Sequence, residues 1–125
     1  MKKLLVLSLL LSIFIMSCGS DTSGSLSVAA PTVSNGVVTA IAKYTPASGS
    51  ALSGQSINFR WYTVGVTSKS KSAEIATSGH TDNSGSVNSQ FTLPVNRTES
   101  IIVYVIATTG DLTNIEGWQS VQVDP

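Results

Sequence analysis

The sequence predicts an all-β fold, a Greek-key sandwich of about seven short strands. From residue 26 onward, apolar and polar residues alternate in short runs rich in Val, Ile, Thr and aromatic residues, which is the pattern of half-buried strands. Gly, Pro, Asn and Asp residues separate these runs at short intervals, as they do in sandwiches. Because the chain contains a single Cys, the predicted sandwich has no internal disulfide.

Length and composition limit the function classes open to the chain. Its 125 residues suit one domain, or one domain with a tail. Seven basic and seven acidic residues give a net charge of zero, whereas a nucleic-acid-binding protein needs a dense basic patch. The single His and single Cys exclude the common zinc sites. No cofactor is expected, because the sequence has no phosphate loop or dinucleotide-binding motif.

Residues 1–17 have the features of a secretory signal peptide and are not expected to belong to the domain. Lys2 and Lys3 form a short cationic start, and residues 4–16 form an apolar run that only two Ser residues interrupt. This run is shorter than the ~18 apolar residues typical of a membrane-spanning helix. We therefore expect residues 1–17 to be removed from the mature chain.

The segment Ile15-Met16-Ser17-Cys18 resembles the lipobox of bacterial lipoproteins. The resemblance implies that the Cys18 thiol is lipidated, that the signal peptide is cut before it, and that its new amino group is acylated. A buried hydrophobic Cys or a free thiol is the alternative, but neither suits a position between an apolar run and a Gly/Ser-rich stretch. Residues 18–25 then form the lipidated end and a flexible tether. Gly19 after the Cys implies sorting to the outer membrane if the cell is Gram-negative.

The first predicted strands are residues 26–30, 37–44 and 56–63. Asn35-Gly36 forms the turn between the first two, and a loop containing Gly and Pro follows the second. In the third strand Ile57, Phe59 and Trp61 alternate with polar residues and are expected to face the core. A shift of one residue would bury Arg60 and expose Trp61, so the register of this strand is well determined.

The remaining predicted strands are residues 73–77, 86–93, 101–108 and 118–123. The first of them is short and is expected at a sheet edge, whereas the third is almost continuously apolar and is expected at a sheet centre. Residues 82–85 form a turn between the first and second. Tyr104 lies on the strand where a tyrosine corner would be sought, and it is interpreted either as that corner or as an ordinary core residue.

Four segments carry recognisable strand and turn motifs. These are a Val-x-Ala strand in residues 37–42, a Gly…Gly turn into Ile-x-Phe in residues 49–59, a Thr-Asp-x-x-Gly turn in residues 80–87, and a Val-x-Val-x-Ala strand in residues 103–107. Together they resemble the bacterial immunoglobulin-like domains repeated in invasin- and intimin-type adhesins. The resemblance covers about residues 27–123 and implies an immunoglobulin-like sandwich over residues 26–125. Those adhesins carry tandem arrays of the domain, whereas this chain has one unit. The motifs describe turns and strands, so they specify fold better than function.

Candidate catalytic and metal-binding groups are few. His80 and Asp82 lie two residues apart, and a Ser-His-Asp site is formally possible. The simpler interpretation is that both are turn residues, with Asp82 bonding to its own backbone, so we expect no enzymatic activity. Asp111, Asn114 and Glu116 share one loop and offer oxygen ligands for calcium. Their spacing is not that of an EF-hand, and solvated loop polarity is the simpler interpretation.

Two pairs of residues are candidates for partner contacts. Lys69 and Lys71 lie in a polar loop, residues 65–72, which an immunoglobulin-like strand order places at the end of the sandwich away from the tether. We expect them to contact a partner more than the loop before the last strand does. Tyr62 and Trp118 are candidates for an aromatic platform that binds a sugar, although such residues more often cover the edge of a sandwich.

These observations favour a non-enzymatic cell-envelope lipoprotein. It would be a structural, adhesive or assembly module held on the outer membrane by acylated Cys18, with an envelope protein or polysaccharide as partner and no nucleic acid. The alternative is a carbohydrate- or ligand-binding lipoprotein that serves an envelope enzyme or transporter. A coplanar pair of exposed aromatic rings would support this alternative.

Overall fold

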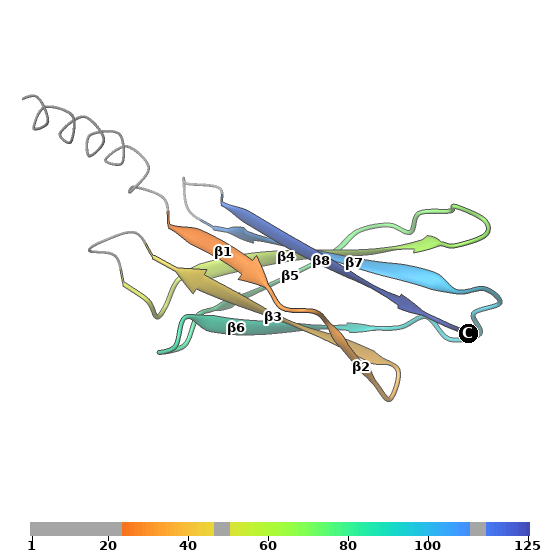
Figure 1. Cartoon of the computed structure of the whole chain (residues 1–125), viewed down its shortest axis with the longest axis horizontal. Helices are drawn as coiled ribbons and strands as arrows, with labels where there is room; N and C mark the ends of the chain where they lie inside the picture. Colours follow the sequence, from red (N-terminus) through yellow and green to blue (C-terminus); the bar gives the residue numbers. More distant parts are fainter. Residues whose placement is uncertain (1–23, 47–50, 111–114) are drawn as a thin grey trace, which may run out of the picture.

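A computed structural model of the chain describes residues 24–46, 51–110 and 115–125 (Figure 1). The predicted signal peptide and Cys18 lie outside these residues. In the described ranges, eight strands form two antiparallel sheets that pack face to face, which confirms the predicted all-β sandwich. None of these ranges contains a helix long and apolar enough to cross a bilayer.

The first sheet consists of β1 (Ser25–Val28), β2 (Thr32–Ser34), β3 (Val37–Thr45) and β6 (Ser86–Thr92). Both β1 and β2 pair with one edge of β3, and β6 pairs with the other. The single first strand predicted at residues 26–30 is therefore wrong in extent. The pairing stops after Val28 and resumes at Thr32, and Pro31 in the gap has no amide hydrogen to donate to the sheet.

The second sheet has the order β5 (Ile75–His80), β4 (Ser56–Gly65), β7 (Ile101–Thr109) and β8 (Glu116–Val123). As predicted, the apolar strand β7 is central and β5 lies at the edge. The observed β5 begins two residues later than predicted and extends to His80. The chain crosses between the sheets after β3, β5 and β6.

The core lies between the facing sides of the two sheets. Its largest fully buried side chains are Trp61, Phe59, Ile57, Val38, Val103 and Val105, which confirms the alternation predicted for β4. The Trp61 ring stacks on Phe91 of the facing sheet, with centroids 5.4 Å apart. Its Nε1 donates a 2.9 Å hydrogen bond to Ser89 Oγ, which lies 2.7 Å from Thr77 Oγ1. The buried indole therefore has the partner that its N–H requires.

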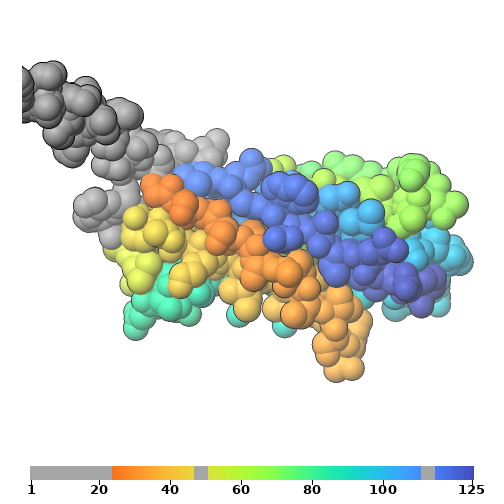
Figure 2. Space-filling model, in the orientation of Figure 1, coloured from red at the N-terminus to blue at the C-terminus, as the bar shows by residue number. Residues whose placement is uncertain are grey.

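The turns follow the predicted chemistry. Asn35 and Gly36 both have positive φ, 51° and 78°, as the favoured two-residue hairpin turn requires, and the β2–β3 hairpin projects from the body of the sandwich (Figure 1). Figure 2 shows β1 lying along β8. At this contact a Cβ on Gly117 would lie 2.7 Å from the carbonyl oxygen of Leu26, so the absence of a side chain allows the two edges to approach.

Strand register fixes which loops share an end of the sandwich. Ser25 at the start of β1 pairs with Thr45 at the end of β3, and Glu116 at the start of β8 pairs with Thr108 near the end of β7. The loop between β4 and β5 lies at the opposite end (Figure 1). This is the arrangement that the immunoglobulin-like strand order predicts.

Candidate functional site

The outward face of the second sheet carries three aromatic side chains from three adjacent strands. Tyr62 of β4 pairs directly with Tyr104 of β7. Trp118 of β8 pairs with Ile106 and is a diagonal neighbour of Tyr104. The interpretation of Tyr104 as a core residue or tyrosine corner is wrong. Because side chains alternate along a strand, the burial of Val103 and Val105 directs Tyr104 outward.

The three rings form one continuous row. Tyr62 and Tyr104 have centroids 5.0 Å apart and ring planes only 15° from parallel, an offset stack. Tyr104 and Trp118 follow at 6.3 Å and 34°. Trp118 at the end of the row is 61% exposed. The rings of Tyr62 and Tyr104 are half-buried. A single exposed apolar residue needs no explanation, but a row of three partly exposed rings is a candidate binding surface.

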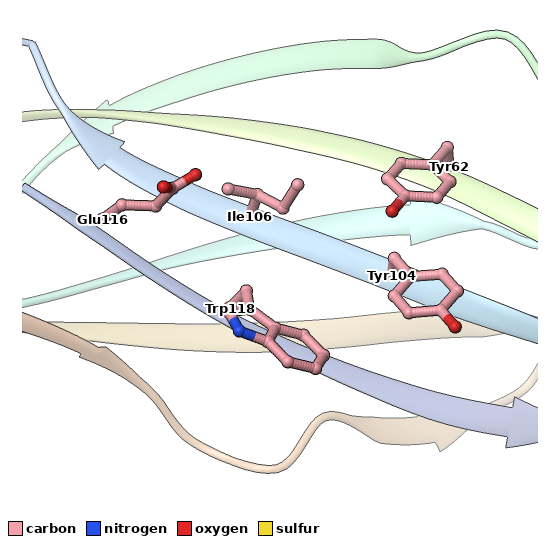
Figure 3. A pocket seen from close by; sticks show the side chains of 5 residues that line it. All are labelled: Tyr62, Tyr104, Ile106, Glu116 and Trp118. Atoms are coloured by element: carbon pink, nitrogen blue, oxygen red, sulfur yellow. The ribbon is translucent and has the colours of Figure 1, made fainter.

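An open hollow of about 290 Å³ lies beside this row. Figure 3 shows Glu116 and Ile106 toward one end of it, the two tyrosines at the other, and Trp118 along the β8 side. The volume is at the lower end of the roughly 300–1,000 Å³ typical of small-molecule sites. The hollow combines apolar surface with one carboxylate, as sites that orient a ligand do.

A chain of ion pairs runs beside the aromatic row. Lys71 Nζ lies 3.7 Å from Glu74, Glu74 lies 3.8 Å from Arg60, and Arg60 lies 3.5 Å from Glu116. The last pair joins β4 to β8 across the intervening strand β7. All four side chains are substantially exposed, so each pair contributes only about 0–1 kcal/mol to stability. Their two positive and two negative charges leave the face locally neutral.

The structure separates the two lysines that were predicted together as partner contacts. Lys71 forms a β-bridge with Val64, and its Nζ lies 4.3 Å from the centre of the Tyr62 ring. It therefore belongs to the aromatic face and is linked through ion pairs to Glu116, a residue that the sequence placed at the opposite end. Lys69 is exposed in the turn between β4 and β5, with φ of 63°.

Glu99 fixes the turn that leads to Lys71. Its carboxylate accepts hydrogen bonds from the Ser68 hydroxyl at 2.6 Å and from the backbone N–H groups of Ser68 and Thr67 at 2.9 and 2.8 Å. These bonds, the Ser68 hydroxyl first, hold the pKa of Glu99 below its ordinary value. A Cβ on Gly65 would collide with this carboxylate and with the Ser68 hydroxyl, so a side chain there would displace both groups from their present positions.

The predicted turn role of Asp82 is visible in its contacts. Its carboxylate accepts hydrogen bonds from the Ser84 hydroxyl and from the N–H groups of Ser84 and Ser86, and these bonds lower its pKa. His80 ends β5 with an exposed side chain. Within the part of the chain that the structure describes, its ring makes no hydrogen bond to a Ser hydroxyl.

The calcium hypothesis falls mostly on residues that the structure does not describe. Asp111 and Asn114 lie outside the described ranges, and Glu116 pairs with Arg60. Among the described residues there is no group of three or more His, Cys, Asp or Glu side chains that could hold a metal ion.

The aromatic face was only partly found from the sequence. Tyr62 and Trp118 were proposed as a platform, but Tyr104 between them was missed, as were Arg60 and Glu74 beside them. The sequence did contain a signal for Tyr104, because it occupies one of the alternate positions of its strand that face outward. The signal was hard to recognise because most other residues of this strand are also apolar. Neither a comparison with protein families nor one with curated proteins finds a match to this chain.

Proposed function

We propose that this chain is a lipid-anchored, non-enzymatic recognition module of a bacterial cell envelope, which binds carbohydrate on the outward face of its second sheet. The observation that carries the proposal is the row of Tyr62, Tyr104 and Trp118 beside an open hollow. This row favours the recognition role over a structural, adhesive or assembly role. The support for the latter role is the immunoglobulin-like fold.

The chemistry of the hollow suits a sugar ring. A sugar presents a face of C–H groups, which packs on an aromatic ring, and a rim of hydroxyl groups, which need hydrogen-bond partners. Trp118 offers an exposed ring for the first. Glu116 and Arg60 offer an acceptor and donors for the second, and hydrogen bonds to charged groups are the stronger kind. An apolar ligand could not form hydrogen bonds with these charged groups.

The charged groups favour binding over catalysis. Glu74 and Glu116 both pair with Arg60. Glycoside hydrolysis instead requires two carboxyl groups that flank the scissile bond, with one held protonated. The ion pairs describe a fixed polar frame beside an aromatic platform, which is what recognition of a sugar requires.

The proposed anchor is acylated Cys18, which the lipobox resemblance supports. Two or more acyl chains give stable membrane attachment, because each buried methylene contributes about 0.8 kcal/mol. In this arrangement the start of β1 is the membrane-proximal end of the sandwich. The aromatic face runs along the side of the strands, where a polymer of the envelope can reach it.

A binding assay tests the carbohydrate role. The full chain, purified in detergent, is applied to an array of neutral, uronic-acid and sulfated oligosaccharides. We expect binding that Trp118→Ala lowers at least tenfold. The matched control is Ile41→Ala, which truncates an exposed apolar side chain on the outward face of the other sheet and should leave affinity unchanged. Equal loss in both variants, or no binding at all, would contradict the proposal.

Metabolic labelling with a fatty acid tests the anchor. We expect label in the wild-type chain and none in Cys18→Ser, because the thiol is the acylated atom in the lipoproteins that this segment resembles. The variant should accumulate as an uncleaved or soluble precursor. Equal labelling of the two proteins would contradict the assignment while leaving the carbohydrate role open to its own test.

A further inference from the structure

We infer that the ligand of this face is a neutral, extended glycan chain that crosses the strands and occupies two adjoining subsites. The inference rests on the proposed carbohydrate-binding function and adds the ligand's charge, length and direction. The first subsite is the aromatic hollow. The second is a polar hollow that neither the sequence motifs nor the aromatic row accounts for.

The second hollow has a volume of about 460 Å³ and lies on the same outward face. It is lined by Asn58 and Arg60 of β4, Ala76 and Ser78 of β5, and Thr108 of β7. Ala76 is small and leaves room above the sheet, while the amide and hydroxyl groups offer both hydrogen-bond donors and acceptors. This lining suits the hydroxyl groups of a sugar that lacks an aromatic partner.

The two hollows adjoin across the strands, the second over β5 and β4 and the first over β7 and β8. Arg60 lines the second hollow and Glu116 lines the first, and these two side chains form the 3.5 Å ion pair. The second hollow reaches Ser78 on β5 and the first reaches Trp118 on β8, and three strand spacings of about 4.8 Å, about 14 Å in all, separate these two strands. That length exceeds a single sugar ring, so one sugar cannot contact both ends.

The charges of the face indicate a neutral chain. Its two cations, Arg60 and Lys71, both pair with Glu74, and Arg60 also pairs with Glu116. A uronic acid or sulfate group would have to displace these carboxylates or lie beside them. Hydroxyl groups can instead form hydrogen bonds to the solvent-exposed nitrogen and oxygen atoms of these ion pairs without separating the charges.

The test is a chain-length series read by tryptophan fluorescence. Trp61 is fully buried and Trp118 is 61% exposed, so protection from iodide quenching reports the aromatic subsite. The probes are the monomer, dimer, tetramer and hexamer of the neutral repeat that the array binds best. The variants are Asn58→Ala in the polar subsite, Trp118→Ala in the aromatic subsite, and Asn88→Ala on β6 of the other sheet as the matched control. Because Trp118→Ala removes the fluorescent reporter, the affinities of all variants are also measured by titration calorimetry.

We expect affinity to rise at least tenfold from monomer to tetramer. Asn58→Ala should lower tetramer affinity about fivefold without changing monomer affinity, Trp118→Ala should lower both, and Asn88→Ala should change neither. If monomer and hexamer bind equally, or if an anionic glycan binds best, the inference is overturned while the proposed function stands. If no glycan protects Trp118, both fall.

Discussion

The two faces of the second sheet use the same kinds of side chain for opposite purposes. On the inner face, Trp61 is completely buried, stacked on Phe91 and hydrogen-bonded to Ser89. On the outward face, Trp118 is 61% exposed and packs beside the half-buried ring of Tyr104. Folding explains the first face, because burial of aromatic surface is the main source of core stability. It does not explain the second.

The difference shows which exposed features of a small sandwich are not needed for folding. The outward face of the first sheet provides the reference, since β3 and β6 present mainly Thr, Asn, Gln and Ser there. A solvated sheet face needs nothing more than such residues. The aromatic row and its ion-pair chain therefore stand out against the protein's own second example of an exposed face.

The largest expected effect comes from Trp61→Ala. Loss of a large buried aromatic side chain costs about 3–5 kcal/mol, a large part of the roughly 5–15 kcal/mol that stabilises a domain. Trp118→Ala, the matched change on the outward face, should cost less than about 1 kcal/mol. Chemical denaturation followed by circular dichroism measures both. Similar denaturation midpoints for the two variants would break the comparison.

Ser89→Ala should have the next largest effect. The Ser89 hydroxyl oxygen accepts the Trp61 indole hydrogen bond and lies beside Thr77 Oγ1. Its removal leaves a buried N–H without a partner, at a cost of about 1–3 kcal/mol. Gln90→Ala, one residue along β6 with an exposed side chain, is the control. An unchanged unfolding free energy for Ser89→Ala would show that the indole finds another acceptor.

Arg60→Met should separate stability from binding on the outward face. The substitution keeps most of the aliphatic side chain but removes both ion pairs, so the unfolding free energy should change by only about 0–1 kcal/mol. Glycan affinity should fall at least fivefold, because the polar frame between the two hollows is lost. Unchanged affinity would remove Arg60 from the proposed site.

Most of the fold could be predicted from the sequence because strand burial leaves a strict period of two. The alternation of Ile57, Phe59 and Trp61 fixed the register of β4, and the positive-φ turn at Asn35-Gly36 follows from local chemistry alone. The short strand β2, which follows the first predicted strand, was not predicted, since it depends on pairing with β3.

The candidate site was predicted only in part, because it is assembled by pairing between strands distant in sequence. Tyr62 and Tyr104 become neighbours through the register of β4 with β7, and Arg60 reaches Glu116 across a third strand. No local pattern contains these relations. Lys71 was assigned to a loop tip because its bridge to Val64 is likewise a matter of tertiary pairing.

The smallest expected effect concerns Glu99, which holds the turn beside the outward face. Its hydrogen bonds to the Ser68 hydroxyl and to two backbone N–H groups place its folded-state pKa below the ordinary value of 4.5. The folded protein therefore binds fewer protons than the unfolded chain at acid pH, and stability rises with pH through this window. The stabilisation is complete above about pH 4.5 and is lost as pH falls through the folded-state pKa.

Glu99→Gln should make Tm less dependent on pH below about 5, and Ser68→Ala should do so partially because it removes the first of the donors. Thermal unfolding from about pH 7 to pH 3 measures the slope, and identical slopes in wild type and Glu99→Gln would show that this carboxylate does not hold the turn in solution.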